Sequence, residues 1–263
     1  MSAAPSGAAP PPAPWPRHAV VTGASRGLGL EIVDLLATAG TRTLGTARNA
    51  AALERALAGT GGGESSAEAV AGDLTDAGHR RRLRREVRDR FGGALDLLVL
   101  NASTLGPSPL PALLDLDPED FTAALRTNLT EQLALVAALA PALRAGQGRI
   151  VAVSSDAAHG AYPGWGAYGA SKIGLELIIR TLAAEEPELH PLIVDPGDLR
   201  TEMHQAAFPG ESIDDRPLPA VTRPFWTWAF AQPPEAARGR RIRAQGDAWT
   251  LPDRAAPDAA GAS

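Results

Sequence analysis

Short apolar runs alternate with longer stretches of helical periodicity along this chain, and this alternation limits its fold more than any other feature. The first run is "HAVVTG" (18–23), the sixth is "HPLIVDPG" (190–197), and a helical stretch of ten or more residues lies between each pair of neighbours. Continuous apolar runs suit strands that are buried on both faces, and strands joined by helices form parallel sheets. The sequence therefore predicts a doubly wound α/β fold with a parallel sheet of six to seven strands and helices on both faces. "GRRIRA" (239–244) is the candidate for the seventh strand.

One domain accounts for most of the 263 residues. A chain of this length can bury a sizeable core, and no second linker interrupts it. The Pro- and Ala-rich start, 1–16, and the end, 253–263, read as a disordered arm and a disordered tail. We therefore expect a single domain over 17–252.

Composition argues against several kinds of partner. The net charge of −5 gives no reason to expect nucleic acid or an anionic membrane, and no apolar run has transmembrane length. The chain has no cysteine, and its five histidines lack the spacing of metal ligands. The start of the chain lacks the pattern of a secretory signal. We expect a cytoplasmic protein without a metal site.

The run "HRRRLRREVRDR" (79–90) resembles a basic nucleic-acid patch. Its apolar residues Leu83 and Val87 are four positions apart, as on the inner face of a surface helix. A run of charges is weak evidence for nucleic acid. We interpret the segment as a solvated helix, and salt-dependent binding to DNA or RNA would indicate the alternative.

A glycine-rich stretch, "TGASRGLG" (22–29), follows the first strand and opens a helix. Glycines let the backbone approach a pyrophosphate, and the helix N-terminus offers N–H groups and a positive dipole end. In this context the motif predicts a nicotinamide dinucleotide site on a Rossmann fold. The expected cofactor contacts in this loop are Gly23, Ser25, Arg26, Gly27, Leu28 and Gly29.

The second strand indicates which dinucleotide binds. NAD-binding folds usually carry an acid near its end, but no Asp or Glu occurs over 41–53. Arg48 occupies that region, and Arg26 lies in the glycine loop. Because guanidinium groups suit a 2′-phosphate, we predict NADP(H). After the third strand, Asp73 and Leu74 are further candidates, and Asp73 could accept from the adenine amino group or only form a turn.

The only lysine of the chain stands four residues after one of its two tyrosines, in "YGASK". Lys172 and Tyr168 therefore share one face of a predicted helix. A phenol is a poor acid at neutral pH, and a neighbouring cation lowers its pKa. The pair indicates a tyrosine tuned for proton transfer, with the lysine also able to bond ribose hydroxyls.

"TGASRGLG" and "YGASK" together resemble the short-chain dehydrogenase/reductase family, over about residues 18–201. The resemblance implies a catalytic tetrad in which Ser155 and Asn128 join Tyr168 and Lys172, with Ser154 as the alternative serine. It also implies cofactor contacts at Asn101, Pro196, Gly197, Thr201, Tyr168 and Lys172. The family usually has Asn-Asn-Ala-Gly after the fourth strand, where this chain has Leu100-Asn101-Ala102-Ser103.

The resemblance implies an NADPH-dependent hydride transfer to or from a small carbonyl or alcohol substrate. Tyr168 would act as general acid, Ser155 would polarise the carbonyl, and Asn128 would anchor a water near Lys172. The apolar helices around Asn128 and Lys172 suggest a homodimer or homotetramer. A non-catalytic NADP(H) sensor on the same fold is the alternative function.

The resemblance also implies that 201–236 forms a lid over the substrate. This segment is rich in aromatic residues, which would favour an apolar substrate if they face the pocket. The same rings could instead pack in the core or between subunits. The residues in question are Phe208, Phe225, Trp226, Trp228 and Phe230, with Tyr162 and Trp165 expected at the pocket mouth.

Overall fold

A computed structural model describes residues 15–61, 67–246 and 248–251 of the chain. Its centre is one seven-stranded parallel sheet with the strand order β3-β2-β1-β4-β5-β6-β7. This confirms the predicted fold class, and "GRRIRA" supplies the seventh strand. The strands are β1 (His18–Thr22), β2 (Arg42–Thr46), β3 (Ala67–Ala69), β4 (Leu97–Leu100), β5 (Arg149–Val153), β6 (His190–Asp195) and β7 (Arg241–Arg243).

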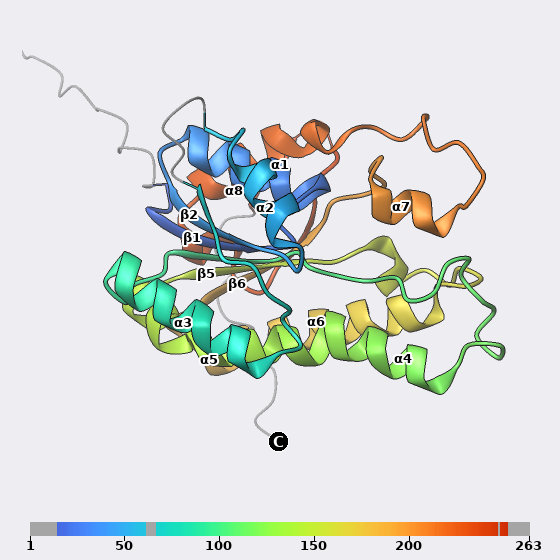
Figure 1. Ribbon diagram of the computed structural model, residues 1–263. Helices are drawn as coiled ribbons and strands as arrows, with labels where there is room; N and C mark the ends of the chain where they lie inside the picture. The colour runs from blue at the N-terminus through green and yellow to red at the C-terminus, as the bar shows by residue number, and fades with distance from the viewer. Residues whose placement is uncertain (1–14, 62–66, 247, 252–263) are drawn as a thin grey trace, which may run out of the picture.

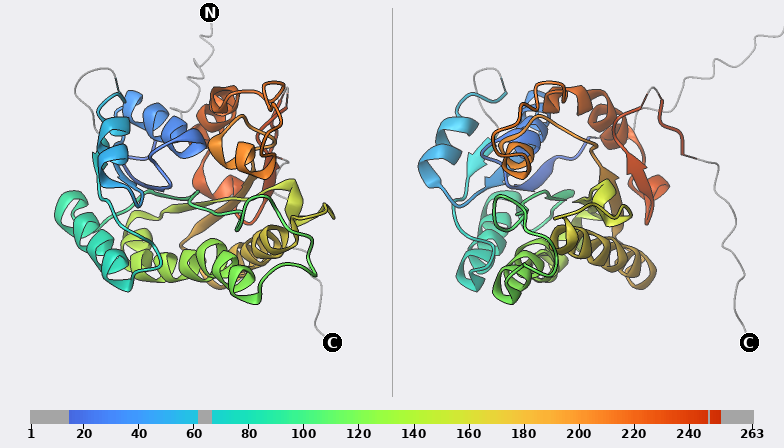
Figure 2. Two further views of the ribbon diagram at one scale, coloured as in Figure 1. Left: turned by 45° about the vertical axis from the view of Figure 1, so that its right-hand side comes forward. Right: turned by 90° about the vertical axis from the view of Figure 1, so that its right-hand side faces the viewer.

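Helices cover both faces of this sheet, as Figures 1 and 2 show. The longer ones are α1 (Gly27–Thr38), α2 (Ala50–Leu57), α3 (Ala77–Phe91), α4 (Pro118–Leu125), α5 (Glu131–Gly146), α6 (Gly166–Glu185), α7 (Glu202–Ala207) and α8 (Arg223–Ala231). The short ones are the π-helical turn η1 (Arg126–Thr130) and the 3₁₀ turns η2 (Asp156–Ala158), η3 (Pro219–Thr222) and η4 (Pro234–Ala237).

The two faces have separate cores. On one face, α1, α2 and α8 pack over the sheet, with Ile32, Leu53 and Trp226 fully buried. On the other face, α3, α5 and α6 pack over it through residues such as Leu83 and Leu139. No helix among the described residues is long and apolar enough to cross a membrane.

The helical stretch over 117–146, between the fourth and fifth apolar runs of the sequence, is interrupted in its middle. Between α4 and α5 the chain makes the π-helical turn η1, which carries Asn128. Such turns are rare and often mark functional sites. Periodicity could not reveal the turn, because a π turn displaces the apolar pattern by only one position.

The segment predicted as a lid has two different roles. α7 and its neighbour Phe208 line the cavity described below, as do Leu218 to Ala220. By contrast α8 belongs to the core, where Phe225 and Trp226 are fully buried. Of the roles that the sequence left open for these rings, core packing therefore holds for α8, whose rings pack beside α1, and a lid stays a prediction for the rest of 201–236.

The described chain begins before the predicted domain boundary. Trp15 packs edge-on against Phe230 at 5.9 Å between ring centroids, and the carbonyl of Pro16 accepts a 2.7 Å bond from Thr41. The rest of the predicted arm and tail, 1–14 and 253–263, lies outside the described residues.

Candidate active site

A cavity of about 1570 Å³ opens at the carboxyl ends of the strands. It runs from the glycine loop after β1, past the ends of β2 to β6, to α7. All of the predicted site residues line it except Gly29 and Asn128, which lie directly behind its wall. The site therefore lies at the switch point of the sheet. There the loops after the neighbouring strands β1 and β4 run in opposite directions.

The glycine loop is held by close backbone contacts. Gly23 has a φ of +66°, and a Cβ on Gly29 would lie 2.2 Å from the Gly23 carbonyl oxygen. Asn101, at the end of β4, donates 2.9 Å and 3.3 Å bonds to the carbonyls of Thr22 and Gly23. Asn101 thus holds the loop in place, and sequence reasoning had assigned it only a cofactor contact.

The N-terminus of α1 faces this loop with its amides available. Arg26 is the N-cap residue, but its side chain makes no capping bond, and the first turn has no acid. Free N–H groups and a positive dipole end suit a phosphate, and the glycines leave space for it. These residues fit the pyrophosphate of a dinucleotide.

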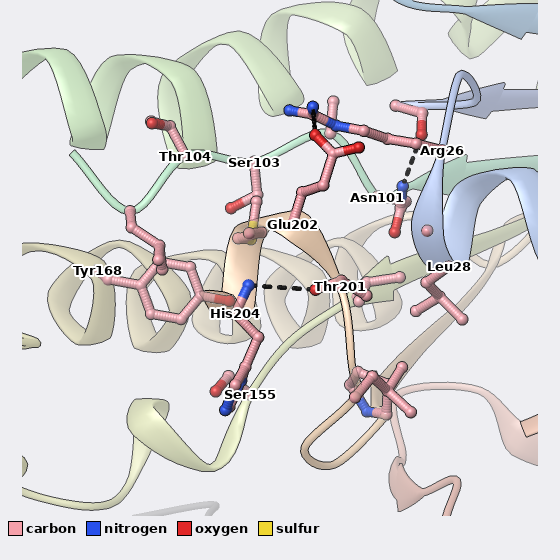
Figure 3. A pocket seen from close by; sticks show the side chains of 18 of the residues that line it. Arg26, Leu28, Asn101, Ser103, Thr104, Ser155, Tyr168, Thr201, Glu202 and His204 are labelled. Carbon is pink, nitrogen blue, oxygen red and sulfur yellow. Dashed lines mark hydrogen bonds and ion pairs between the residues drawn. The ribbon is translucent and has the colours of Figure 1, made fainter. Parts of the chain in front are cut away.

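Arg26 also reaches across the cavity. Its guanidinium forms an ion pair with Glu202, the first residue of α7 (Figure 3). Both side chains are exposed. The pair connects the glycine loop to α7, and Glu202 competes for the group that the sequence assigned to a 2′-phosphate.

Arg48 and Asp73 lie together where the cavity passes the ends of β2 and β3. The charge of Arg48 acts on the Asp73 carboxyl, whose oxygen also accepts a 2.8 Å bond from the Thr75 amide. Burial acts to raise the pKa of Asp73, but these partners outweigh it and hold the pKa below its ordinary value. Asp73 therefore makes the turn that the alternative reading expected, and it still lines the cavity.

Tyr168 and Lys172 both lie on the buried face of α6. The Lys172 ammonium lies 5.4 Å from the centre of the Tyr168 ring and donates a 2.8 Å bond to the Val153 carbonyl. Burial lowers the pKa of Lys172 to about 8. Burial also raises the pKa of Tyr168, while hydrogen bonding with Ser155 and Ser103 opposes this. The expected lowering of the Tyr168 pKa was therefore wrong for this structure, because desolvation, together with the charges of Asp195 and Asp156, outweighs the two serines.

The two candidate serines point to different partners. Ser154 is buried and donates a 2.6 Å bond to Glu176 of α6. Ser155 caps η2 by accepting from Ala157, donates a 3.0 Å bond to Asp156, and also hydrogen-bonds with the Tyr168 phenol. The geometry therefore places Ser155, and not Ser154, beside the tyrosine.

Asn128 lies behind the cavity wall, in η1. Its oxygen accepts from the Ser103 hydroxyl at 3.0 Å and from the Thr104 amide at 2.8 Å. Its nitrogen donates to the Thr104 carbonyl at 2.8 Å and to Ser171 at 3.0 Å. The side chain therefore anchors the segment after β4. Ser103, one of the two departures from the family pattern, provides one of these contacts and also faces Tyr168 (Figure 3).

The far end of the cavity is aromatic and apolar. Trp165 meets Tyr168 edge-on at 5.6 Å and Phe208 at 6.5 Å between ring centroids. Leu105 and Met203 pack against the same cluster. Tyr162, predicted at the pocket mouth together with Trp165, lies there and donates a 2.8 Å bond to Asp156. The walls around the phenol therefore favour an apolar ligand.

Sequence reasoning missed the polar cluster behind this wall. Glu176 is fully buried on α6, four residues after Lys172, and bonds His159 at 3.0 Å and Arg241 at 2.9 Å. A lone glutamate within the apolar run "KIGLELII" was the available signal for Glu176. Arg241 had no comparable signal in an arginine-rich chain. Among the described residues, no group of three or more potential metal ligands comes together.

The fold and the site define a dinucleotide-binding α/β protein. A family model described as short chain dehydrogenase matches residues 17–212, and relatives more than 30% identical match about 70% of the chain. The chain therefore belongs to the short-chain dehydrogenase/reductase family.

Relatives with assigned names include two reductases. A sepiapterin reductase of Meriones unguiculatus is 36% identical over 199 residues, covering 72% of this chain and 76% of the relative. A benzil reductase ((S)-benzoin forming) of Saccharomyces cerevisiae is 32% identical over 194 residues, covering 71% and 73%.

Solved structures share the fold. A short chain dehydrogenase of Escherichia coli CFT073, solved with NADPH, superposes with a TM-score of 0.79 at 28% identity, covering 88% of this chain and 97% of that chain. A similar protein of Shigella flexneri, solved with NADP, gives 0.79 at 27% identity, covering 88% and 97%.

Proposed function

We propose that this protein is an NADPH-dependent oxidoreductase that transfers hydride between the nicotinamide and a carbonyl or alcohol substrate. One observation carries the proposal. The Tyr168 phenol and the Ser155 hydroxyl face each other in a cavity that continues without interruption to the glycine loop. This arrangement joins a proton donor, a polarising hydroxyl and a dinucleotide cradle in one space.

NADP(H) is the proposed form of the cofactor. Arg48 lines the adenine end, and the loop after β2 has no carboxylate to bond a free ribose hydroxyl. Arg26 is the second cation within reach of this end. The two structural neighbours solved with NADP and NADPH support the same choice.

When bound, the nicotinamide supplies the hydride. Ser155, with its hydroxyl hydrogen turned away from Asp156, donates a hydrogen bond to the substrate oxygen and polarises the carbonyl. Tyr168 then gives its phenolic proton to that oxygen as negative charge develops there. A raised phenol pKa keeps this proton in place until the charge forms. Lys172, charged below about pH 8, supplies a positive charge 5.4 Å from the centre of the Tyr168 ring.

The substrate proposed for this site is an apolar carbonyl compound. Trp165, Phe208 and Met203 form apolar walls beside the phenol, and these contacts bind carbon surface better than charge. The relatives named as sepiapterin and benzil reductases support reduction as the direction.

Replacing the proton donor tests the enzyme proposal. We expect Tyr168→Phe to lower kcat for carbonyl reduction by about 10²–10⁴-fold, since the general acid is lost. NADPH binding, followed by quenching of protein fluorescence, should remain within about two-fold. The matched control is Tyr162→Phe, which changes the only other tyrosine at the pocket mouth.

The same experiment separates the enzyme from the NADP(H) sensor. Turnover of a ketone panel by the wild type that disappears only in Tyr168→Phe supports the enzyme. Tight NADPH binding without turnover of any substrate, and a biological role that Tyr168→Phe leaves intact, would favour the sensor.

We also propose that the protein is a homo-oligomer. Three large apolar residues, Leu133 of α5 and Ile173 and Leu177 of α6, are 39%, 39% and 63% exposed. They give these helices an apolar outer face that a second copy could cover. The mass of the wild type and of Leu177→Glu in solution tests this assignment.

A further inference from the structure

The guanidinium of Arg241 connects three segments next to the cavity: α6, the loop after β5 and the end of β6. Arg241 of β7 donates a 2.9 Å bond to Glu176 of α6, a 3.0 Å bond to Asp195 at the end of β6, and a 3.1 Å bond to the backbone carbonyl of Ser155. α6 carries Tyr168, and the Ser155 loop carries the polarising hydroxyl. Neither the sequence motifs nor the family resemblance gives Arg241 or Glu176 a role.

The carboxylates that Arg241 bonds are deeply buried. The side chains of Glu176 and Asp195 are 0% and 4% exposed, so neither can be solvated by bulk water. A buried carboxylate is stable only when cations and hydrogen-bond donors satisfy it. Arg180 also donates to Glu176, at 2.8 Å, but Arg241 bonds both carboxylates. The guanidinium is therefore fixed in position by two anions.

The cluster of Arg241, Glu176 and Asp195 also holds the loops that follow β5 and β6. Glu176 accepts a 2.6 Å bond from Ser154, directly before Ser155. Asp195 accepts a 2.9 Å bond from the amide of Gly197, in the segment predicted to contact the cofactor. The chain of bonds thus runs from α6 through Arg241 to both loops. All of these bonds have ordinary lengths.

We propose that Arg241 is a positioning residue that sets the Ser155 loop against Tyr168 and the Pro196–Gly197 segment against the cofactor. Its planar fork of donors satisfies three acceptors at fixed angles, which the single ammonium of a lysine cannot reproduce. A misplacement of about 1 Å at a reacting group can cost about 10²-fold in rate. The inference rests on the proposed function, because it concerns the same serine, tyrosine and cofactor.

Replacing Arg241 provides the test, with NADPH reduction of an apolar ketone as the assay. We expect Arg241→Met to lower kcat by about 10²-fold while the ketone KM changes by less than about three-fold, because Ser155 is displaced but the apolar walls remain. NADPH affinity, measured by fluorescence without substrate, should fall several-fold through the Asp195–Gly197 bond. Arg241→Lys keeps the buried cation but not the fork of donors. Its melting temperature should therefore be closer to the wild-type value than its kcat is.

Arg180→Met is the matched control. It removes a second cation from the same carboxylate, but Arg180 is 42% exposed and bonds neither Ser155 nor Asp195 in the described structure. We expect its kcat and NADPH affinity to remain within about two-fold of wild type.

Three outcomes decide between the possibilities. A folded Arg241→Met enzyme with wild-type kcat overturns the inference while leaving the proposed function intact. Equal losses of kcat in Arg241→Met and Arg180→Met also overturn it. Such losses would indicate that Glu176 needs any neighbouring cation, and not the particular bonds of Arg241. A wild-type protein that binds no NADPH and reduces no ketone contradicts the proposed function itself. If Arg241→Met does not fold, Arg241→Lys carries the same comparison of kcat with melting temperature.

Discussion

The two sides of the cavity are built by different physical means. The glycine loop after β1 is held by uncharged contacts: Gly29 packs closely against the Gly23 carbonyl, and the side-chain amide of Asn101 donates to the same loop. The opposite side, at the ends of β5 and β6, is held by charges, with Arg241 between Glu176 and Asp195. The glycine loop leaves no room for a side chain at Gly29, whereas the side at β5 and β6 buries charged side chains.

This difference suits what each side is proposed to bind. A pyrophosphate carries charge of its own, so its cradle needs free N–H groups and space more than it needs ions. A reacting carbonyl is neutral until charge develops on its oxygen, so the catalytic side must have its dipoles oriented in advance. Buried ion pairs are costly to assemble but hold such groups rigidly.

The largest expected effect is on the neutral side. Gly29→Ala would place a methyl group 2.2 Å from the Gly23 carbonyl oxygen, and neither backbone segment can move without breaking the Asn101 bonds. We expect the free energy of unfolding to fall by more than about 4 kcal/mol, or no folded protein. Chemical denaturation, followed by circular dichroism, measures the free energy of unfolding of the wild type and of Gly29→Ala.

Gly59→Ala is the control for that substitution. The nearest atom to an added Cβ there is 3.7 Å away, an ordinary contact, and its stability should change by less than about 1 kcal/mol. A Gly29→Ala protein as stable as the control would break the comparison, because close packing would then not be what holds the glycine loop.

The same difference explains what could be predicted from sequence. The glycine loop and the Tyr168–Lys172 pair were predictable because their geometry is local, within one turn or one helical repeat. The bonds of Arg241 join residues 46 to 86 positions apart, and no local pattern records them. The interruption at Asn128 was likewise missed, and the sequence left open whether the α8 rings face the pocket or the core, because tertiary packing decides both.

A second prediction concerns the cost of charge on the catalytic side. Burial lowers the pKa of Lys172 from its ordinary 10.5 to about 8, so the folded state disfavours the ammonium. Between these two values the unfolded state binds more protons than the folded state, and stability therefore rises with pH. Below about pH 8 the full penalty remains, about 3 kcal/mol.

Denaturation of wild type and Lys172→Met at several pH values measures this cost. We expect the wild type to gain about 2 kcal/mol relative to Lys172→Met between pH 7 and pH 9.5, because only the wild type loses the buried charge. The comparison stops below the ordinary pKa of phenols, so that tyrosine ionisation does not enter. A difference that stays constant across this range would falsify the buried-cation assignment.

The smallest effect lies where the two sides meet, at the exposed pair of Arg26 and Glu202. An exposed ion pair contributes little, so a 2′-phosphate can displace Glu202 from Arg26 at small cost.

Glu202→Gln removes the competitor, and we expect it to tighten NADPH binding about two- to five-fold while leaving NADH binding unchanged. Arg26→Ala should weaken NADPH binding and abolish the effect of Glu202→Gln in the double variant. If Glu202→Gln instead alters NADPH and NADH binding equally, the pair acts by holding α7 over the cavity, and the preference for NADP(H) depends on Arg48 alone.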